Sequence, residues 1–122
     1  MRWLRGKARE SGEQAEELAC RYLQTQGLRL VTRNHRCRRG EIDLIMEDGE
    51  SLVFVEVRYR ASARFGSAAE SVDARKRTRL IAAAGHFLQQ QRRNRPCRFD
   101  VVAISGAAEP DLQWITNAFE AE

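Results

Sequence analysis

Two carboxylates in a predicted β-hairpin are the residues of this sequence best placed to do chemistry. Asp43 lies on the first of two alternating apolar segments and Glu56 lies on the second. Asp48-Gly49 separates the segments, and this dipeptide between alternating residues is a strong hairpin signal. With that turn, the two acids are diagonal neighbours on one face, with Cα atoms about 7–8 Å apart. Carboxylates at that separation can share Mg²⁺, a hard cation that prefers oxygen ligands.

The same register divides the hairpin into two faces, because side chains alternate along a strand. One face is an apolar core surface that consists of Ile42, Leu44, Met46, Val53, Val55, Val57 and Tyr59. The opposite face consists of Glu41, Asp43, Ile45, Leu52, Phe54, Glu56 and Arg58, with Glu41 directly opposite Glu56. Acids packed together without a cation would repel one another and raise one another's pKa. Solvated acids paired with arginines would give the same pattern, so a metal site and an exposed face both remain open.

The elements around this hairpin predict an α/β fold. Helices are expected at residues 12–26 and 73–91, and strands at 28–33, 41–47, 51–60, 97–105 and, as a short edge strand, 112–115. This order implies a central mixed sheet with a helix packed on each side. Residues 1–10 are basic and are expected to be flexible, and residues 11–119 are expected to form a single domain.

The distribution of charge favours a polyanionic partner. The chain has 21 basic and 17 acidic residues, and the tail from Ser105 onward holds four of the acids and no Lys or Arg. All but two of the basic residues are arginine, which binds phosphate in a bidentate manner, although a codon bias would give the same composition. Arg36, Arg38 and Arg39, in a predicted basic loop, and Arg60 are the candidate phosphate-binding residues.

Other features of the sequence exclude several classes of protein. The start of the chain lacks the apolar region of a secretory signal, and no apolar run approaches the length of a membrane span. We therefore expect a cytoplasmic protein without a membrane partner. The three cysteines form no Cys-x-x-Cys pair, so free thiols are expected rather than a disulfide framework or a zinc ribbon.

Several stretches of the chain resemble the YraN family of restriction-endonuclease-like proteins. They are residues 12–16 (GEQAE), 40–45 (GEIDLI), 55–60 (VEVRYR), 65–66 (FG), 72–76 (VDARK), 97–102 (CRFDVV) and 114–119 (WITNAF). The resemblance extends from about residue 6 to residue 119. It implies a restriction-endonuclease-like core, related to Holliday-junction resolvases, with a mixed β-sheet flanked by helices. Related resolvases are dimers, so the resemblance also allows a homodimer.

The resemblance also implies roles for individual residues. In this group of nucleases a helix-borne Glu, an Asp and a Glu-x-Lys pair form the site, and these positions correspond to Glu16, Asp43, Glu56 and Arg58. The first three would hold Mg²⁺ or Mn²⁺, and Glu16 would orient water. Arg58 departs from the lysine of the pattern, and arginine cannot act as a base, although it can stabilise negative charge. Lys76 could supply the missing ammonium group if it reaches the site.

The function implied is metal-dependent hydrolysis of phosphodiester bonds in DNA, with branched DNA as one possible substrate. An accessory protein that binds nucleic acid through a weakened or lost nuclease site is the alternative. A scaffold that binds only other proteins is a third class. Cleavage, binding without cleavage, and absence of binding distinguish the three.

Overall fold

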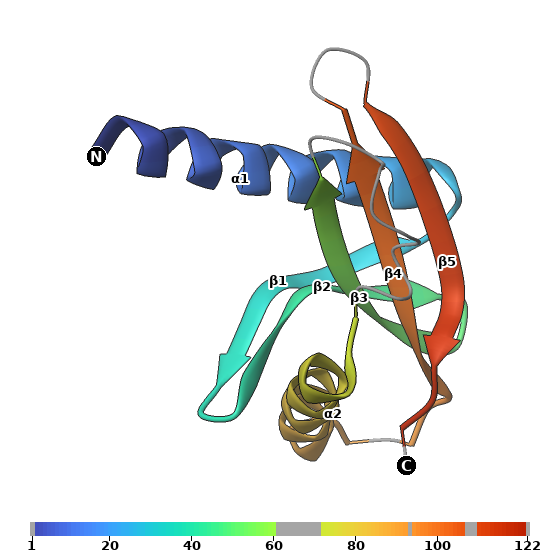
Figure 1. Cartoon of the computed structure of the whole chain (residues 1–122). Coiled ribbons are helices and arrows are strands. Elements are labelled where there is room, and N and C mark those ends of the chain that lie inside the picture. Colours follow the sequence, from blue (N-terminus) through green and yellow to red (C-terminus); the bar gives the residue numbers. More distant parts are fainter. Residues whose placement is uncertain (1, 61–71, 93, 107–109, 122) are drawn as a thin grey trace.

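A five-stranded mixed sheet with one helix on each face forms the body of the protein (Figure 1). This computed structural model describes residues 2–60, 72–92, 94–106 and 110–121, and side-chain surroundings from residue 12 onward. The elements are α1 (Arg2–Thr25), β1 (Arg29–Cys37), β2 (Gly40–Asp48), β3 (Ser51–Arg60), α2 (Ala74–Gln89), β4 (Cys97–Ser105) and β5 (Asp111–Phe119). None of the described helices is both long and apolar enough to cross a membrane.

The strands follow one another across the sheet in the order β1-β2-β3-β4-β5. β3 and β4 are parallel, and every other neighbouring pair is antiparallel. Parallel neighbours need a crossover connection, and α2 lies in the chain between these two strands. The expected α/β class is confirmed, and the arrangement is consistent with a restriction-endonuclease-like core.

The two helices bury opposite faces of the sheet. The cluster under α1 consists of Ala15, Ala19, Cys20, Leu23, Leu28, Leu44, Met46, Val53, Val55, Val102 and Ile104. The cluster under α2 consists of Ile42, Ile45, Leu52, Phe54, Val72, Leu80, Ala83, Ala84, Phe87, Phe99 and Val101. Each fully buried large apolar side chain contributes about 1.5–3 kcal/mol relative to exposure, so both helices are held mainly by these contacts.

Three predicted boundaries differ from the structure. α1 begins at Arg2 rather than near residue 12, so the segment expected to be flexible belongs to this helix from Arg2 onward. β5 extends to Phe119 and is a full strand. The basic segment 33–39 is not a loop, because β1 continues to Cys37 and leaves residues 38–39 as a tight turn. Pairing with β2 overrides the polar composition of this segment.

The turn of the β2–β3 hairpin lies one residue later than predicted. Asp48 pairs with Ser51, so Gly49 and Glu50 form the loop. Gly49 has a φ of 60°, which a two-residue hairpin loop requires at this position and which glycine adopts without strain. Every pairing therefore shifts by two residues, and the predicted opposition of Glu41 and Glu56 is wrong.

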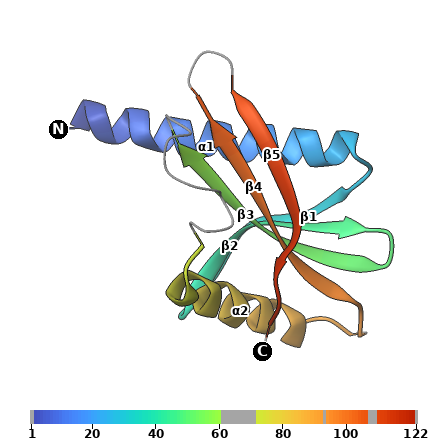
Figure 2. The same cartoon turned by 45° about the vertical axis from the view of Figure 1, so that its right-hand side comes forward.

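The tip of the β1–β2 hairpin lies against α2, as both views show (Figures 1 and 2). A Cβ atom on Gly40 would collide with the backbone carbonyl of Arg79, so only glycine allows this close approach. His35 Nε2 and His86 Nδ1 are 3.0 Å apart in a hydrogen bond between β1 and α2. The His35 ring also contacts Phe87 edge to face, with ring centroids 5.4 Å apart. The hairpin tip is thus fixed to α2 by backbone and side-chain contacts.

Candidate functional site

The alternation of side chains along β2 breaks at Asp43. Ile42 packs in the cluster under α2 and Leu44 packs under α1, although residues two apart on a regular strand share a face. The prediction that Ile42 and Leu44 share a face is therefore wrong. Asp43 Oδ2 accepts the backbone N–H of Val57 at 2.8 Å, just beyond the Leu44–Val55 pair. A side-chain oxygen thus replaces a backbone partner here, and the carboxylate is fixed between two strands.

Glu56 is buried on the α2 side of β3, with 4% of its surface exposed. Its Oε2 atom lies 3.1 Å from Lys76 Nζ, in the first turn of α2. The geometry is not that of a hydrogen bond, and within the described residues this buried oxygen has no hydrogen-bond partner. Burial raises the pKa of Glu56 to about 8, with Asp43 raising it further and Lys76 offsetting part of the shift. Leaving a buried carboxylate oxygen unsatisfied is costly for folding.

The structure brings Asp43 and Glu56 together at the edge of the β2–β3 pairing. Asp43 acts on the pKa of Glu56 both through a hydrogen bond to the protonated carboxyl and through its negative charge. Two adjacent carboxylates have the donor chemistry that a hard cation prefers, because Mg²⁺ is usually held by one or two protein carboxylates. Within the described part of the chain, no group of three or more His, Cys, Asp or Glu residues is arranged to hold a metal ion.

Glu16 on α1 interacts with Asp43, one member of this pair, without joining a compact group of three ligands. Partial burial raises the pKa of Glu16 to about 7, and the negative charges of Asp43 and Glu41 add to the rise. A hydrogen bond from Asn34 and the charge of Arg33 oppose it. Glu16 is therefore close enough to Asp43 for their charges to interact, which is the part of its predicted placement that the structure shows.

The arginines predicted to bind phosphate lie in two separate places. Arg36, Arg38 and Arg39 are exposed at the tip of the β1–β2 hairpin, where Arg36 Nε lies 3.0 Å from Glu41 Oε2. Arg60 is the exposed last residue of β3, and this end of β3 points away from the tip of the β1–β2 hairpin (Figure 1). Residues 61–71, which follow it, lie outside the described residues. Three of the four arginines thus form one surface, and Arg60 does not belong to it.

A depression of about 410 Å³ lies beside the acid pair. It is lined by Arg58, Asp73, Arg75, Lys76 and Arg79. Lys76 therefore reaches the acid pair, where its ammonium group lies beside Glu56, and it also lines this depression. Arg75 and Arg79 belong to a cluster of basic residues, 75–79, that the sequence places at the start of the predicted second helix and beside the site. They are not among the four arginines predicted individually to bind phosphate, although their spacing of four residues puts them on one side of that helix.

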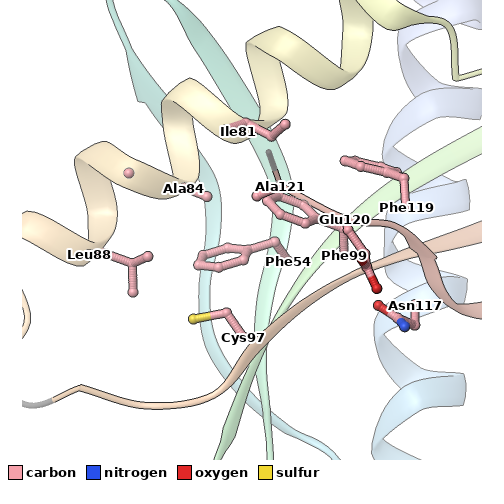
Figure 3. A pocket seen from close by; sticks show the side chains of 11 residues that line it. Phe54, Ile81, Ala84, Leu88, Cys97, Phe99, Asn117, Phe119, Glu120 and Ala121 are labelled. Atoms are coloured by element: carbon pink, nitrogen blue, oxygen red, sulfur yellow. The ribbon is translucent and has the colours of Figure 1, made fainter.

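A second hollow, of about 550 Å³, lies between α2 and the end of β5 (Figure 3). Its lining consists of Phe54, Ile81, Ala84, Gly85, Leu88, Cys97, Phe99, Asn117, Phe119, Glu120 and Ala121. Most of these residues are apolar, and Glu120 is the charged residue among them. None of the predicted site residues lines it, so this hollow is separate from the acid pair.

Asp100, in β4, is a buried acid with a full set of partners. Its side chain accepts hydrogen bonds from Trp114 Nε1 at 2.9 Å, from the Asn117 backbone N–H at 2.9 Å and from Arg98 Nε at 3.0 Å. Asn117 has a φ of 51°, and the pairing of β4 with β5 shifts register nearby. Asp100 thus holds an irregular part of the sheet edge in place.

Comparison with known proteins places the chain among close relatives. The sequence profile of the uncharacterised protein family UPF0102 matches residues 15–104, a range that contains Glu16, Asp43 and Glu56. A UPF0102 protein of Nitrosococcus oceani is 58% identical over 117 residues, 93% of this chain and 94% of the relative. UPF0102 proteins of Pseudomonas aeruginosa and Pseudomonas fluorescens are 55% and 54% identical, each over 96% of this chain and 98% of the relative.

Proposed function

The chain belongs to the UPF0102 (YraN) family, and we propose that it is a metal-dependent hydrolase of phosphodiester bonds in nucleic acid. Asp43 and Glu56 are the carboxylates that would hold Mg²⁺ or Mn²⁺. The observation that carries the proposal is the burial of Glu56 next to a second carboxylate, with the Lys76 ammonium group as its charge partner. Strongly perturbed acids of this kind concentrate at functional sites. A bound divalent ion would supply Lewis-acid activation of water and offset negative charge on phosphate.

The residues around the pair have distinct tasks in this proposal. The Val57 N–H fixes the orientation of Asp43 through its 2.8 Å hydrogen bond. Glu16, with a pKa of about 7, can hold or release a proton at its carboxylate near neutral pH. Arg58 and Lys76, which line the adjacent depression, stabilise negative charge that develops on the phosphate. Arg58 keeps its proton, so it cannot serve as a base.

The basic surface indicates the substrate class. Arg36, Arg38 and Arg39 lie on the hairpin tip that α2 supports, and the depression beside the acid pair is lined by four basic side chains. Groups of this kind bind phosphates without reading sequence, and their binding depends strongly on salt. We propose DNA as the substrate, with branched DNA as the structure to test first.

A cleavage panel tests the proposal. Duplex, single-stranded, flap and four-way DNA are incubated with the protein in Mg²⁺ or Mn²⁺, and products are separated on denaturing gels. We expect cleavage that falls by about 100-fold or more in Asp43→Asn and Glu56→Gln, because catalysis would depend on the bound ion. Glu13→Gln is the control, since Glu13 is exposed on α1 three residues from Glu16. Cleavage that persists in both variants of the acid pair would contradict the proposal.

Arg58 favours a second candidate, a nucleic-acid-binding accessory protein with an inactive site. The pattern of the wider group of nucleases has a lysine where this chain has arginine, and arginine cannot take a proton from water. The same panel distinguishes the two functions. Salt-sensitive binding without cleavage, unchanged in Asp43→Asn and Glu56→Gln, would support the accessory protein. Absence of binding even at low salt would leave a protein-binding scaffold.

A further inference from the structure

The depression beside the acid pair is formed by one side of the first half of α2. Arg75, Lys76 and Arg79 line it, as expected for residues one and four apart on a helix. Arg77, which lies between them in sequence, lines a different hollow that faces Phe119 and Glu120 at the end of β5. The helix therefore separates a basic run of sequence into two surfaces, and only one of them borders Glu56.

Two of the cations that line this depression are the guanidinium groups of Arg75 and Arg79. Within the part of the chain that the structure describes, neither Arg75 nor Arg79 has an ion-pair or hydrogen-bond partner. Asp73 is the carboxylate of the lining, and its Oδ1 caps α2 by accepting the Lys76 backbone N–H at 2.9 Å. The Lys76 N–H is thus already occupied by the Asp73 cap, and the basic side chains of the lining are the groups that would bind an anion entering the depression.

Two of the residues that line the depression contact the two parts of the proposed site. Lys76 contacts Glu56 on one side, with Nζ 3.1 Å from Oε2. On the other side, the carbonyl of Arg79 lies against Gly40, where the turn that carries Arg38 and Arg39 ends. A polyanion that crosses the depression would therefore reach the acid pair at one end and the hairpin tip at the other.

We propose that this depression is a phosphate-binding subsite, in which Arg75 and Arg79 bind a phosphodiester that neighbours the one presented to Asp43 and Glu56. The inference rests on the proposed function for the identity of the ligand, a nucleic-acid strand. It adds that the strand runs along α2 between the acid pair and the hairpin tip. Arginine side chains bind phosphate through paired, charge-assisted hydrogen bonds.

The test measures binding of a fluorescein-labelled DNA duplex by anisotropy in EDTA, so that no divalent ion contributes. Arg75→Ala, Arg79→Ala and the double variant are compared with Arg77→Ala, which makes the same change of net charge on the same helix. Each of the first two is expected to weaken binding about 5- to 10-fold at about 0.1 M salt. Each should also lower the slope of log Kd against log salt by about 0.9. Arg77→Ala should change Kd by less than about 2-fold.

The outcomes separate this inference from the proposed function. Equal weakening in Arg75→Ala, Arg79→Ala and Arg77→Ala would overturn the subsite and leave only a general effect of charge. No change in the first two would overturn it as well. Selective loss of binding, together with no cleavage by the unaltered protein, would support the subsite and contradict the hydrolase. Exposed arginines on a helix tolerate alanine, and thermal unfolding of each variant verifies that it is folded.

Discussion

Two buried acids on neighbouring parallel strands differ sharply in their surroundings. Asp100 on β4 accepts hydrogen bonds from an indole, a backbone amide and a guanidinium group. Glu56 on β3 has an ammonium group beside it, a second acid as its neighbour and an oxygen without a hydrogen-bond partner among the described residues. Their burial is similar, at 1% and 4% exposure. Burial alone therefore says nothing about the role of either acid.

The two acids are expected to have opposite effects on the stability of the native state. A buried carboxylate with several donors stabilises the native state, whereas an unsatisfied one beside a like charge destabilises it. Proteins keep destabilised groups of the second kind mainly where function requires them. The contacts of Asp100 are those of a structural residue, and Glu56 is the acid that we propose for the site.

The largest effect on stability is expected for Asp100→Ala. The change leaves the Arg98 guanidinium and the Trp114 indole N–H without their buried partner, and removal of one member of such a network costs about 3–5 kcal/mol. Urea unfolding followed by Trp fluorescence measures the free energy of unfolding. A loss below about 1 kcal/mol would mean that Asp100 is not the anchor that its contacts indicate.

Divalent cations should produce the next largest effect. If Asp43 and Glu56 hold Mn²⁺, a concentration about 100 times its Kd stabilises the folded protein by about 2.7 kcal/mol. Thermal unfolding with and without Mn²⁺ measures the shift, and Glu56→Gln is expected to abolish it. An equal shift in Glu56→Gln would place the ion elsewhere on the protein.

Glu56→Gln should also flatten the dependence of stability on pH. Because its pKa is raised from 4.5 to about 8, the folded state holds this proton more tightly than the unfolded state between those values. The contribution of Glu56 is therefore fully present below about pH 4.5 and is lost as the pH rises through about 8. The variant mimics the protonated form, so at pH 8–9 without metal it should be more stable than the parent, by at least about 1 kcal/mol, the equivalent of one pKa unit. Unfolding curves at several pH values test this, and parallel profiles for the two proteins would contradict it.

Asp48→Ala should have the smallest effect. Asp48 is the second partner of Arg98, with Oδ2 and Nη1 3.0 Å apart, and its side chain is 46% exposed. Exposed ion pairs contribute about 0–1 kcal/mol. The same urea titration as for Asp100→Ala gives the comparison. Similar losses of unfolding free energy in the two variants would show that the buried Arg98–Asp100 pair contributes no more to stability than the exposed Arg98–Asp48 pair.

The sequence was sufficient to predict which strands carry the two acids. Side-chain alternation along a strand is set by backbone geometry. The turn lies one residue later than predicted, so each residue of β2 faces a β3 residue two positions further along. Asp43 and Glu56 still lie on neighbouring strands, next to the Leu44–Val55 pair. The sequence was not sufficient to predict the face of the sheet on which Ile42 lies. Side-chain alternation along β2 breaks at Asp43, where the carboxylate accepts a hydrogen bond from the Val57 N–H on β3. Local patterns carry no information about such a contact.

The other features that the sequence did not predict depend on contacts between residues far apart in the chain. Polar composition suggested a loop at residues 33–39, but pairing with β2 extends β1 through it. The contact of Lys76 with Glu56 depends on where α2 packs, and 19 intervening residues separate the two in sequence. Helical geometry places Arg77 on a different side of α2 from Arg75 and Arg79. Which of these two sides faces the acid pair depends on how α2 packs against the sheet.

The close approach of Gly40 to Arg79 has a thermodynamic consequence for binding. Because backbone lies directly on backbone there, the hairpin tip cannot swing away from α2 without breaking the packing between them. The backbone positions of the arginines on the turn (Arg38 and Arg39) and on α2 (Arg75 and Arg79) are therefore fixed relative to one another in the unbound protein. A long anion that touches both would immobilise only side chains, so the protein is preorganised and loses little conformational entropy on association.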